Sequence, residues 1–497
     1  MTSPIDSSHP TAASHPTRVC VVPGGPDGLP VTGSIRPPGS KSLTNRALVC
    51  AAFASGKSRL TGTLVSEDTE VMIESLAKIG VSIKPVDGGR TLVVEGVGGV
   101  VSDDARRISA DEPVEMFIAN SGTTVRFLTA ALSAFGGKYH LSGIERMHER
   151  PIGDLIDAIA PALDGWIVAT SPEKCPPVEI DSRGWTGQTM RVGGGVSSQY
   201  LSGLMMAGPI SGKEIRLEIV GEMVSMPYVR MTARLMESFG ATVDWNFENL
   251  GSEFSEGLED SGANLASVIV GGAYEGCEFE IEPDASAASY FWAAAAITGG
   301  RVKVTGLDEN ASQGDVGFAR VLERMGCGYS CDQSGIEIRG GRLRGLDVDM
   351  GEISDCTQTL AVVALFAEEP TRVRGVAHNR FKETDRIGNL AIELRRLGAQ
   401  IDEHDDGLTI HPLPGIRDDS ESPIVFETYN DHRMAMSFAL LGLRLPGIEI
   451  ANPACTRKTY PEFWADLESL TGRAHHWTRD SDDEREFTDT HVHGKNA

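Results

Sequence analysis

The feature that most constrains the fold of this chain is a pattern that recurs six times along its sequence. In each copy a helix-like stretch ends in an apolar residue, and a glycine and a strand-like run follow. We expect each glycine to lie just beyond the end of a helix, where a left-handed backbone is common. The glycines are Gly80, Gly165, Gly240, Gly326, Gly398 and, in a degenerate copy, Gly472, with spacings of 85, 75, 86, 72 and 74 residues.

The spacing of these copies indicates the size of each unit. Repeats of about 20–50 residues are typical of solenoids, whereas about 80 residues suffice for a small α/β unit. Six such units predict two domains of three units each. Strands rich in β-branched residues alternate with amphipathic helices, which we expect near residues 228–239, 318–325 and 385–397. The predicted class is α/β (α+β), with helices covering sheets.

Charge and cysteine usage exclude several classes of protein. The chain of 497 residues carries 70 acidic and 45 basic side chains, a net charge of −25. Such a surface repels nucleic acid and anionic lipid, and no apolar run reaches the roughly 18 residues of a membrane span. The eight cysteines are scattered and form no CxxC pair, which argues against a zinc site or a disulfide framework. We expect a cytoplasmic protein without nucleic-acid or membrane partners.

The two ends of the chain differ from its body. Residues 1–17 are rich in Ser, Thr, Pro and His and lack an apolar segment, so we expect a disordered extension and no secretory signal. Residues 472–497 are charged, lack periodicity and hold four of the twelve histidines. A metal-binding tail is one interpretation, and a disordered acidic tail is the one we favour. The folded body is then expected to span residues 18–471.

Familiar catalytic motifs are absent or incomplete. Gly56-Lys57-Ser58 resembles the end of a P-loop, but Ala51 stands where that motif needs its first glycine. His432 has no HExxH partner, and no serine lies in a GxSxG elbow. The sequence therefore indicates neither metal-assisted nor serine-hydrolase chemistry, and we expect no metal and no cofactor.

Seven loops are instead dense in small polar residues and cations. Small residues before a helix place backbone N–H groups where an anion binds, and arginine offers a paired hydrogen-bond donor to phosphate or carboxylate. Any one of these loops is weak evidence, but together they predict a pocket for one or more polyanionic small molecules. The loops are residues 38–46, 120–126, 146–153, 197–200, 382–386, 429–433 and 455–459.

These loops, in this order, carry a resemblance to a known family. The segments PPGSKSLTNRAL, NSGTTVRFLTA, ERPIGDL, SSQYLSGL, EPDASAASYF, KETDRI, YNDHRMAM and CTRKTYP span about residues 25–470. They resemble the 3-phosphoshikimate 1-carboxyvinyltransferases, also called 5-enolpyruvylshikimate-3-phosphate (EPSP) synthases. The sister family, the UDP-N-acetylglucosamine enolpyruvyl transferases, shares the fold and chemistry. That family differs at the first loop and usually carries a reactive loop cysteine, which we do not identify here.

The resemblance implies a two-domain inside-out α/β barrel in which each domain consists of three βαβαββ repeats. The first strand crosses to the C-terminal domain in this family. The expected domains are therefore residues 39–282, and residues 18–38 together with 283–471. Hinges near Pro38 and Glu282 would let the two domains close over the substrates.

The resemblance also implies a reaction without cofactors. The family transfers the enolpyruvyl group of phosphoenolpyruvate to the 5-hydroxyl of shikimate 3-phosphate through a tetrahedral adduct, releases phosphate, and serves the shikimate pathway to chorismate and aromatic amino acids. Asp355 matches the carboxylate that accepts the hydroxyl proton, and Glu383 matches the acid/base for the methylene carbon. Lys41 matches a catalytic residue that touches both substrates and shares in proton transfer. Alternatively, Asp355 caps a helix and Glu383 pairs with Arg386 three residues on.

The substrate-binding residues follow from the same match. Asp68 and Asn120 match further polar positions, and Tyr228 is either a contact or a packing residue. Shikimate 3-phosphate would contact Lys41, Ser42, Arg46, Ser197, Ser198, Gln199, Ser225, Asp355 and Lys382, with Arg46 at its carboxylate. Phosphoenolpyruvate would contact Lys41, Gly122, Arg150, Gln199, Arg386, Arg433 and Lys458.

Three positions depart from the family pattern, and other functions stay open. His378-Asn379, Met226 and Phe127 stand where relatives often have Asn-Trp, Lys and Pro. A UDP-sugar transferase and a non-catalytic anion-binding scaffold are the alternatives. The two carboxylates Asp355 and Glu383 argue against a scaffold, because a module that only binds anions has no need of them. We expect a monomer that has only small molecules as partners.

Overall fold

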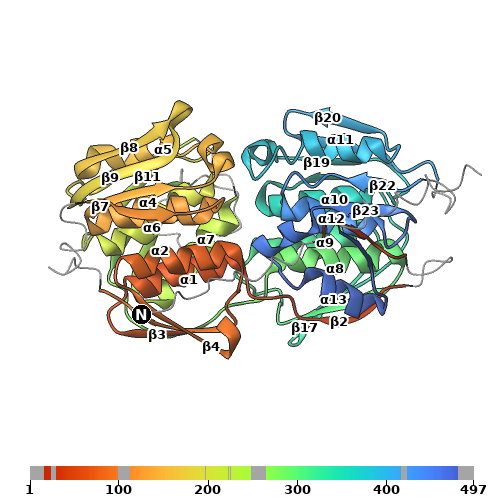
Figure 1. Cartoon of the computed structure of the whole chain (residues 1–497), viewed down its shortest axis with the longest axis horizontal. Coiled ribbons are helices and arrows are strands. Elements are labelled where there is room, and N and C mark those ends of the chain that lie inside the picture. Colours follow the sequence, from red (N-terminus) through yellow and green to blue (C-terminus); the bar gives the residue numbers. More distant parts are fainter. Residues whose placement is uncertain are drawn as a thin grey trace, which may run out of the picture.

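A computed structural model describes residues 16–23, 30–98, 112–195, 197–221, 223, 225–247, 265–415 and 422–479. The chain forms two halves that lie side by side, one built largely from its first 280 residues and the other from the remainder (Figure 1). Within the described residues, no helix is long and apolar enough to cross a membrane. All eight cysteines lie in this part of the chain, and each is a free thiol.

Each half contains three four-stranded sheets. The strands of the first half, in sheet order, are β14 (Glu278–Glu280), β3 (Lys57–Thr61), β5 (Thr91–Glu95) and β4 (Ser82–Val86); β6 (Val114–Phe117), β7 (Gly137–Ser142), β9 (Cys175–Trp185) and β8 (Leu163–Ser171); and β10 (Thr189–Gly193), β11 (Ile215–Val220), β13 (Leu265–Gly272) and β12 (Ala241–Phe247).

The second half repeats the arrangement. Its strands, in sheet order, are β2 (Thr32–Ile35), β15 (Arg301–Thr305), β17 (Gly335–Arg339) and β16 (Gly328–Asp332); β18 (Asp347–Asp349), β19 (Thr371–Arg374), β21 (Gly407–Ile410) and β20 (Ile401–His404); and β22 (Ile424–Phe426), β23 (Ile448–Ala451), β1 (Arg18–Cys20) and β24 (His476–Thr478). In all six sheets the first two strands pair in parallel and the other neighbours pair antiparallel.

Helices pack against the sheets of each half. The first half holds α1 (Lys41–Ala52), α2 (Glu67–Lys78), α4 (Gly122–Phe135), α5 (Gly153–Ile159), α6 (Ser198–Ile210) and α7 (Met226–Ser238), and the second holds α8 (Ala285–Thr298), α9 (Phe318–Arg324), α10 (Thr357–Ala364), α11 (Gly388–Arg396), α12 (His432–Leu441) and α13 (Phe463–Thr471). Every residue of α4 and of α8 is buried, as expected for helices that are covered on all sides. The buried apolar residues form two separate cores, one in each half.

Two segments carry the chain between the halves. Strand β2 precedes α1 but pairs with β15 of the second half, whereas β14 pairs with β3 of the first half. The two crossing segments bond to each other, because Ser40 donates its backbone N–H to Glu282 (2.8 Å) and Asp284 donates to Pro38 (2.8 Å). The predicted α/β class, with helices covering sheets, is confirmed. Each sheet formed by the described strands is open, with no closed barrel among them.

The repeat glycines all adopt positive φ angles, but one of them was assigned to the wrong element. Gly80, Gly240, Gly326, Gly398 and Gly472 lie at or directly after the last residues of helices, as predicted. Gly165 (φ +138°) instead lies inside strand β8, where the register with β9 shifts. A Cβ atom there would collide with the carbonyl oxygen of Asp181, so this glycine serves a β-bulge.

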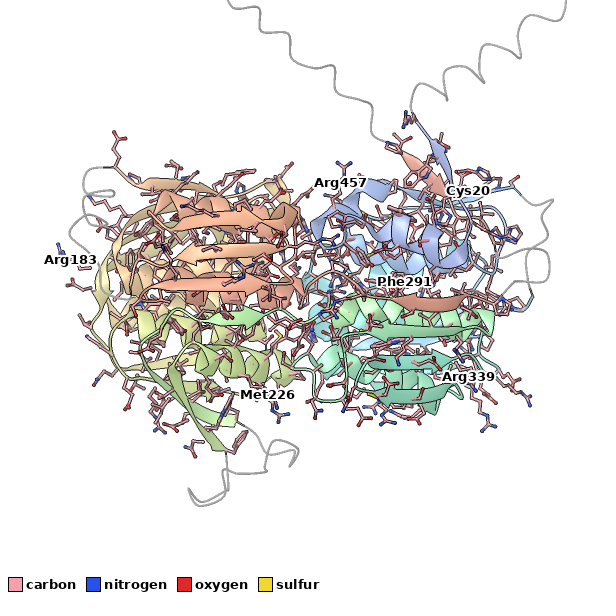
Figure 2. All side chains as sticks on the ribbon, turned by 90° about the horizontal axis from the view of Figure 1, so that it is seen from below. Cys20, Arg183, Met226, Phe291, Arg339 and Arg457 are labelled. Atoms are coloured by element: carbon pink, nitrogen blue, oxygen red, sulfur yellow. The ribbon has the colours of Figure 1, made fainter. Side chains whose placement is uncertain are left out.

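The prediction of a disordered tail from residue 472 is also wrong at its start. His476–Thr478 form strand β24, which pairs antiparallel with β1 from the beginning of the chain. Figure 2 labels Cys20 on β1, which pairs with β23 and β24. It also labels Phe291 of α8 within the second half. Trp477 packs edge-on against Trp464 of α13 (ring centroids 5.8 Å apart). Of the extension expected at residues 1–17, residues 1–15 lie outside the described residues, as does the tail at 480–497. Thr17 is described, and its backbone N–H donates to the carbonyl oxygen of Thr478 at 2.9 Å, so the expected disorder is wrong at that residue.

Candidate active site

A polar cavity of about 40 Å³ lies between the halves, and both halves line it. Six of its side chains are cationic and three are carboxylates, in a chain whose net charge is −25. A concentration of positive charge within an acidic protein attracts small anions and holds them at this point. The lining residues are Lys41, Asp68, Gly122, Thr123, Arg126, Arg150, Gln199, Asp355, Lys382, Glu383, Arg386, His432 and Arg433.

Four helices begin at this cavity, and an N-cap side chain fixes the first turn of each. Ser40, Ser121 and Ser197 accept backbone N–H bonds in the first turns of α1, α4 and α6, and Asp431 accepts one from Arg433 in α12. The remaining N–H groups and the helix dipoles favour negative charge at these four ends. The cavity therefore combines helix termini with cationic side chains, as the loop composition predicts.

Arg386 is the centre of the ion-pair network on the second half. Its Nε lies 2.7 Å from Asp431 Oδ2, its Nη1 lies 3.1 Å from Asp355 Oδ1, and its Nη2 lies 2.8 Å from Glu383 Oε2. The guanidinium is buried, and these three carboxylates raise its pKa despite the loss of water. Arg433 Nη2 completes the network at 2.6 Å from Asp355 Oδ2.

The two carboxylates predicted to be catalytic are held ionised. Burial alone would raise the pKa of Asp355, but Arg433 and Arg386 hold it well below its usual range. Burial likewise opposes ionisation of Glu383, whereas Lys458 and Arg386 keep its pKa well below the ordinary value. Both groups are therefore ionised, and neither holds a proton to donate.

Lysines stand near both carboxylates. Lys458 Nζ lies 2.9 Å from Glu383 Oε1, and Lys41 Nζ lies 3.5 Å from Asp68 Oδ2. Burial lowers the pKa of Lys382 to about 8, against the opposing charge of Asp355. An ammonium group with a pKa of about 8 is able to exchange a proton near neutral pH.

The two arginines that the first half contributes to the cavity, Arg126 and Arg150, are held by neutral oxygens. Arg150 Nη1 donates to the carbonyl oxygen (3.1 Å) and to the side-chain oxygen (3.3 Å) of Asn120, and burial lowers its pKa. Arg126 Nη1 donates to Gln199 Oε1 at 2.5 Å. Because these cations form no ion pair with a carboxylate among the described residues, an anionic ligand would supply their missing counter-charge.

Gly122 is packed directly against Arg150. A Cβ atom added at Gly122 would lie 2.9 Å from Arg150 Cζ and closer still to Nη2. The absence of a side chain is therefore required for the guanidinium to lie where it does.

Several contacts join the two halves across the cavity. Lys458 in η9 (Pro453–Lys458) donates to the carbonyl oxygen of Asn120 at 3.1 Å. Arg146 in η2 (Glu145–Glu149) donates to the carbonyl oxygens of Glu383 (3.2 Å) and Lys382 (3.3 Å). Tyr228 Oη lies 3.3 Å from Asp355 Oδ2. The halves are thus in contact through the site itself.

The structure brings together most, but not all, of the residues singled out from the sequence. Ser42 and Tyr228 line a smaller neighbouring cavity, Ser225 donates to the Gly351 carbonyl oxygen (3.3 Å), and Lys458 reaches the site through Glu383. Outside the lining of the main cavity lie Ser42, Arg46, Ser197, Ser198, Ser225, Lys458 and Asn120, whereas Lys41, Asp68, Gly122, Arg150, Gln199, Asp355, Lys382, Glu383, Arg386 and Arg433 line it.

Arg46 is buried, and no carboxylate of the residues that the structure describes forms an ion pair with it. Its Nε donates to Thr232 Oγ1 (2.7 Å), its Nη1 to the Ser42 carbonyl oxygen (3.0 Å), and its Nη2 to Ser202 Oγ (3.3 Å). The ring of Phe127 lies beneath the guanidinium at 5.0 Å. Burial lowers the pKa of Arg46 to about 10.

The alternatives for the two carboxylates are resolved in part. Asp355 lies within η7 (Gly351–Cys356) and is not the N-cap of α10, which is Cys356. Glu383 does pair with Arg386, although the two residues precede α11 and do not lie on a helix. His378 Nε2 lies 3.0 Å from Ser354 Oγ, and Asn379 donates to the Ser354 carbonyl oxygen (3.0 Å), so both support the segment that carries Asp355.

The sequence did not single out five residues that matter here. Thr123, Arg126 and His432 line the cavity, Asp431 holds Arg386, and Asp315 lies behind Tyr228. The first four lie in loops already identified by composition. Asp315 lies in none of them, and only its three-dimensional position connects it with the site. Among the described residues, no group of three or more His, Cys, Asp and Glu side chains is arranged to hold a metal ion.

Comparison with known proteins assigns the chain to a family. The sequence model of EPSP synthase (3-phosphoshikimate 1-carboxyvinyltransferase) matches residues 27–467. The chain belongs to this family. It is 40% identical over 441 residues to the 3-phosphoshikimate 1-carboxyvinyltransferase of Vibrio vulnificus (strain YJ016), covering 89% of this chain and 97% of that one. The chloroplastic enzyme of Brassica napus is 39% identical over 452 residues (89% and 83%).

Solved structures agree with this assignment. EPSP synthase from Acinetobacter baumannii superposes with a TM-score of 0.71 at 25% identity, covering 93% of this chain and all of that chain. The enolpyruvyl transferase NikO from Streptomyces tendae has a TM-score of 0.68 at 17% identity, covering 94% and 100%, and shares the fold. The family therefore rests on both sequence and architecture.

Proposed function

We propose that this chain transfers the enolpyruvyl group of phosphoenolpyruvate to the 5-hydroxyl of shikimate 3-phosphate and releases phosphate. The family assignment supports the reaction. The observation that carries it at the level of residues is the cavity between the halves, where two ionised carboxylates lie among six cationic side chains. Two phosphates and two carboxylates must be held in this reaction, and one hydroxyl must lose a proton.

Asp355 is proposed as the base for the 5-hydroxyl. It lines the cavity, is ionised, and is fixed by two arginines at 3.1 and 2.6 Å. A base held in one orientation accepts the hydroxyl proton as the oxygen attacks C2 of phosphoenolpyruvate, which gives the tetrahedral adduct. Gln199, Ser197, Ser198, Ser225, Ser42 and Arg46 are proposed to bind shikimate 3-phosphate around this base.

Glu383 and Lys382 are proposed to serve proton transfer at the methylene carbon. Glu383 is paired with Lys458 and Arg386, so it holds no proton to give. A phosphate and a carboxylate arriving at Lys458, Arg386, Arg433 and Arg150 would compete for those cations. The pKa of Glu383 then rises, so that it gains a proton only once phosphoenolpyruvate is bound.

Lys41 is proposed to contact both substrates and to share in proton transfer. It begins α1, which follows the crossing segment between the halves, and its Nζ faces Asp68 in the cavity. We also propose that the two halves are the domains expected from the sequence, residues 39–282, and 18–38 with 283–471, the latter extended by β24. The three units of each would form an inside-out barrel around the central helices, and the halves would close about the crossing segments near Pro38 and Glu282. A monomer in the cytoplasm stays a prediction.

The first experiment measures phosphate released from phosphoenolpyruvate by the purified chain, with shikimate 3-phosphate or UDP-N-acetylglucosamine as acceptor and a chelator present. Release with shikimate 3-phosphate alone is expected. Release only with the sugar nucleotide would mean that the acceptor is wrong although the chemistry is right. No release with either acceptor, in a chain whose fold is verified by circular dichroism, would contradict the proposal.

A further inference from the structure

Three oxygen atoms, Asp355 Oδ2, Tyr228 Oη and Asp315 Oδ2, form a line that runs from the cavity into the second half. Tyr228 Oη, from α7 of the first half, lies 3.3 Å from Asp355 Oδ2 and 3.1 Å from Asp315 Oδ2. Asp315 lies in η6 (Gly314–Gly317) and is 4% exposed. Because the tyrosine comes from one half and the carboxylates from the other, the line exists only when the halves are in contact.

The number of protons in this line is decided by its geometry. A tyrosine hydroxyl carries one proton and can donate to one oxygen only, whereas an ionised carboxylate oxygen can only accept. If both aspartates were ionised, one of the two contacts to Tyr228 would join two acceptors and would be repulsive. One of the two carboxyl groups must therefore carry a proton for both contacts to be hydrogen bonds.

The surroundings decide that Asp315 is the protonated partner. Asp355 is paired with Arg386 and Arg433, whereas Asp315 forms no ion pair among the described residues. Its Oδ2 accepts a hydrogen bond from Ser286 of α8, and its Oδ1 is buried without a partner. An unpartnered oxygen costs less in a neutral carboxylic acid than in a carboxylate.

Taken together, burial and the charged groups around Asp315 raise its pKa. Burial and the negative charge of Asp355 in η7 raise the pKa of Asp315 to about 7, with Asp284 before α8 adding to the shift. The Ser286 hydrogen bond and Arg433 of α12 lower it in part. Tyr228, from α7, and Cys356, beside Asp355, complete the titratable groups that face it, and burial raises the pKa of both well above their ordinary values.

We propose that protonated Asp315 is a positioning residue that directs the Tyr228 hydroxyl towards Asp355, the base for the 5-hydroxyl. Asp315 donates its proton to Tyr228 Oη, and Tyr228 donates its own proton to Asp355 Oδ2. Loss of the Asp315 proton to solvent lets Tyr228 turn towards Asp315, and an oxygen lone pair then faces Asp355. The base loses one of its three fixing contacts. This inference rests on the proposed function, because it assigns Asp355 that role.

The test is the pH dependence of kcat for the unmodified chain and for Asp315→Asn. With the Asp315 proton titrating near pH 7, the fraction of molecules with the full line falls from about 0.9 at pH 6 to about 0.03 at pH 8.5. We expect kcat of the unmodified chain to fall about tenfold or more over this range. The amide of Asp315→Asn donates at every pH, so the ratio of variant to unmodified kcat should rise by a similar factor. Titration of the substrates cancels in that ratio.

Two controls separate positioning from a structural role. Tyr228→Phe removes the central oxygen, so adding Asp315→Asn to it should leave the pH profile of Tyr228→Phe unchanged. Asp315→Ala, which cannot donate a hydrogen bond to Tyr228, should have a lower kcat than the unmodified chain at pH 6. Its kcat should fall little further between pH 6 and pH 8.5. A ratio of variant to unmodified kcat that is constant between pH 6 and 8.5 would overturn the proposal, since a structural defect acts equally at both values.

The unmodified chain provides a readout that does not depend on activity. The infrared difference spectrum between pH 6 and 8.5 should show the loss of a protonated-carboxyl band, and that band should be missing from Asp315→Asn. Its absence from the unmodified chain would also overturn the proposal. A chain that shows this band but does not turn over shikimate 3-phosphate would instead contradict the proposed function alone.

Discussion

Replacing Gly122 by alanine tests whether the position of Arg150 determines the binding of phosphoenolpyruvate. The added methyl would lie 2.9 Å from Arg150 Cζ and closer to Nη2, so the guanidinium has to move. Arg150 is buried, and its Nη1 is held by two oxygens of Asn120. A charge-assisted hydrogen bond contributes about 1.5–3 kcal/mol, so loss of one bond to the ligand weakens binding by roughly 10- to 150-fold.

Steady-state kinetics distinguishes this effect from a general defect. We expect KM for phosphoenolpyruvate to rise by that factor, with KM for shikimate 3-phosphate and kcat within about threefold of the unmodified chain. Gly193→Ala is the matched control, because a Cβ atom there meets only Asp154 Oδ2, at an ordinary 3.8 Å. An unchanged KM for phosphoenolpyruvate in Gly122→Ala would refute the reasoning, since Arg150 would then not hold this substrate.

Three further predictions follow from other parts of the structure. Asp355→Ala should lower kcat by about 10²- to 10⁴-fold while the Kd of shikimate 3-phosphate, from calorimetry, changes less than tenfold; unchanged turnover would remove Asp355 from the catalytic set. Because folding raises the pKa of Asp315 from 3.8 to about 7, the native state binds the extra proton between these values and loses stability as the pH rises through this window. Asp315→Asn avoids that loss, so the difference in unfolding free energy between this variant and the unmodified chain should change by up to about 4 kcal/mol in favour of the variant from pH 4 to pH 8. The same difference in unfolding free energy at both pH values would contradict this. A chain ending after Thr471 should have a Tm several degrees below one ending after Arg479, because β1 then loses β24; equal values in scanning calorimetry would show that β24 contributes nothing.

The parts of the fold that could be predicted are those set by local backbone chemistry. The pattern of a glycine after an apolar run predicts a positive φ angle, and all six glycines have one. The pattern does not distinguish a helix end from a β-bulge, since both need that backbone, and Gly165 was therefore assigned to the wrong element. Strand β24 was missed because three residues are too short for a period and its partner is more than 450 residues away.

The candidate site was predictable where its residues lie in dense polar loops. Lys41, Arg150 and Arg386 come from three such loops, and the structure brings them around one cavity. The position of Arg46 was not predictable, because its hydroxyl partners Thr232 and Ser202 lie far along the chain. Asp315 carries no local signal either, because its role depends on a tyrosine 87 residues away.

Asp431 shows why residues with a double role are hard to recognise from sequence. As the N-cap of α12 it accepts the backbone N–H of Arg433 at 2.8 Å, and an aspartate before a helix is adequately explained by that role. The same carboxylate also holds Arg386 at 2.7 Å while completely buried. One fixed side chain therefore aligns the helix that carries Arg433 with the guanidinium of Arg386. The relative position of these two cations is thus set by the fold before any ligand binds, and the arriving anion need not organise them.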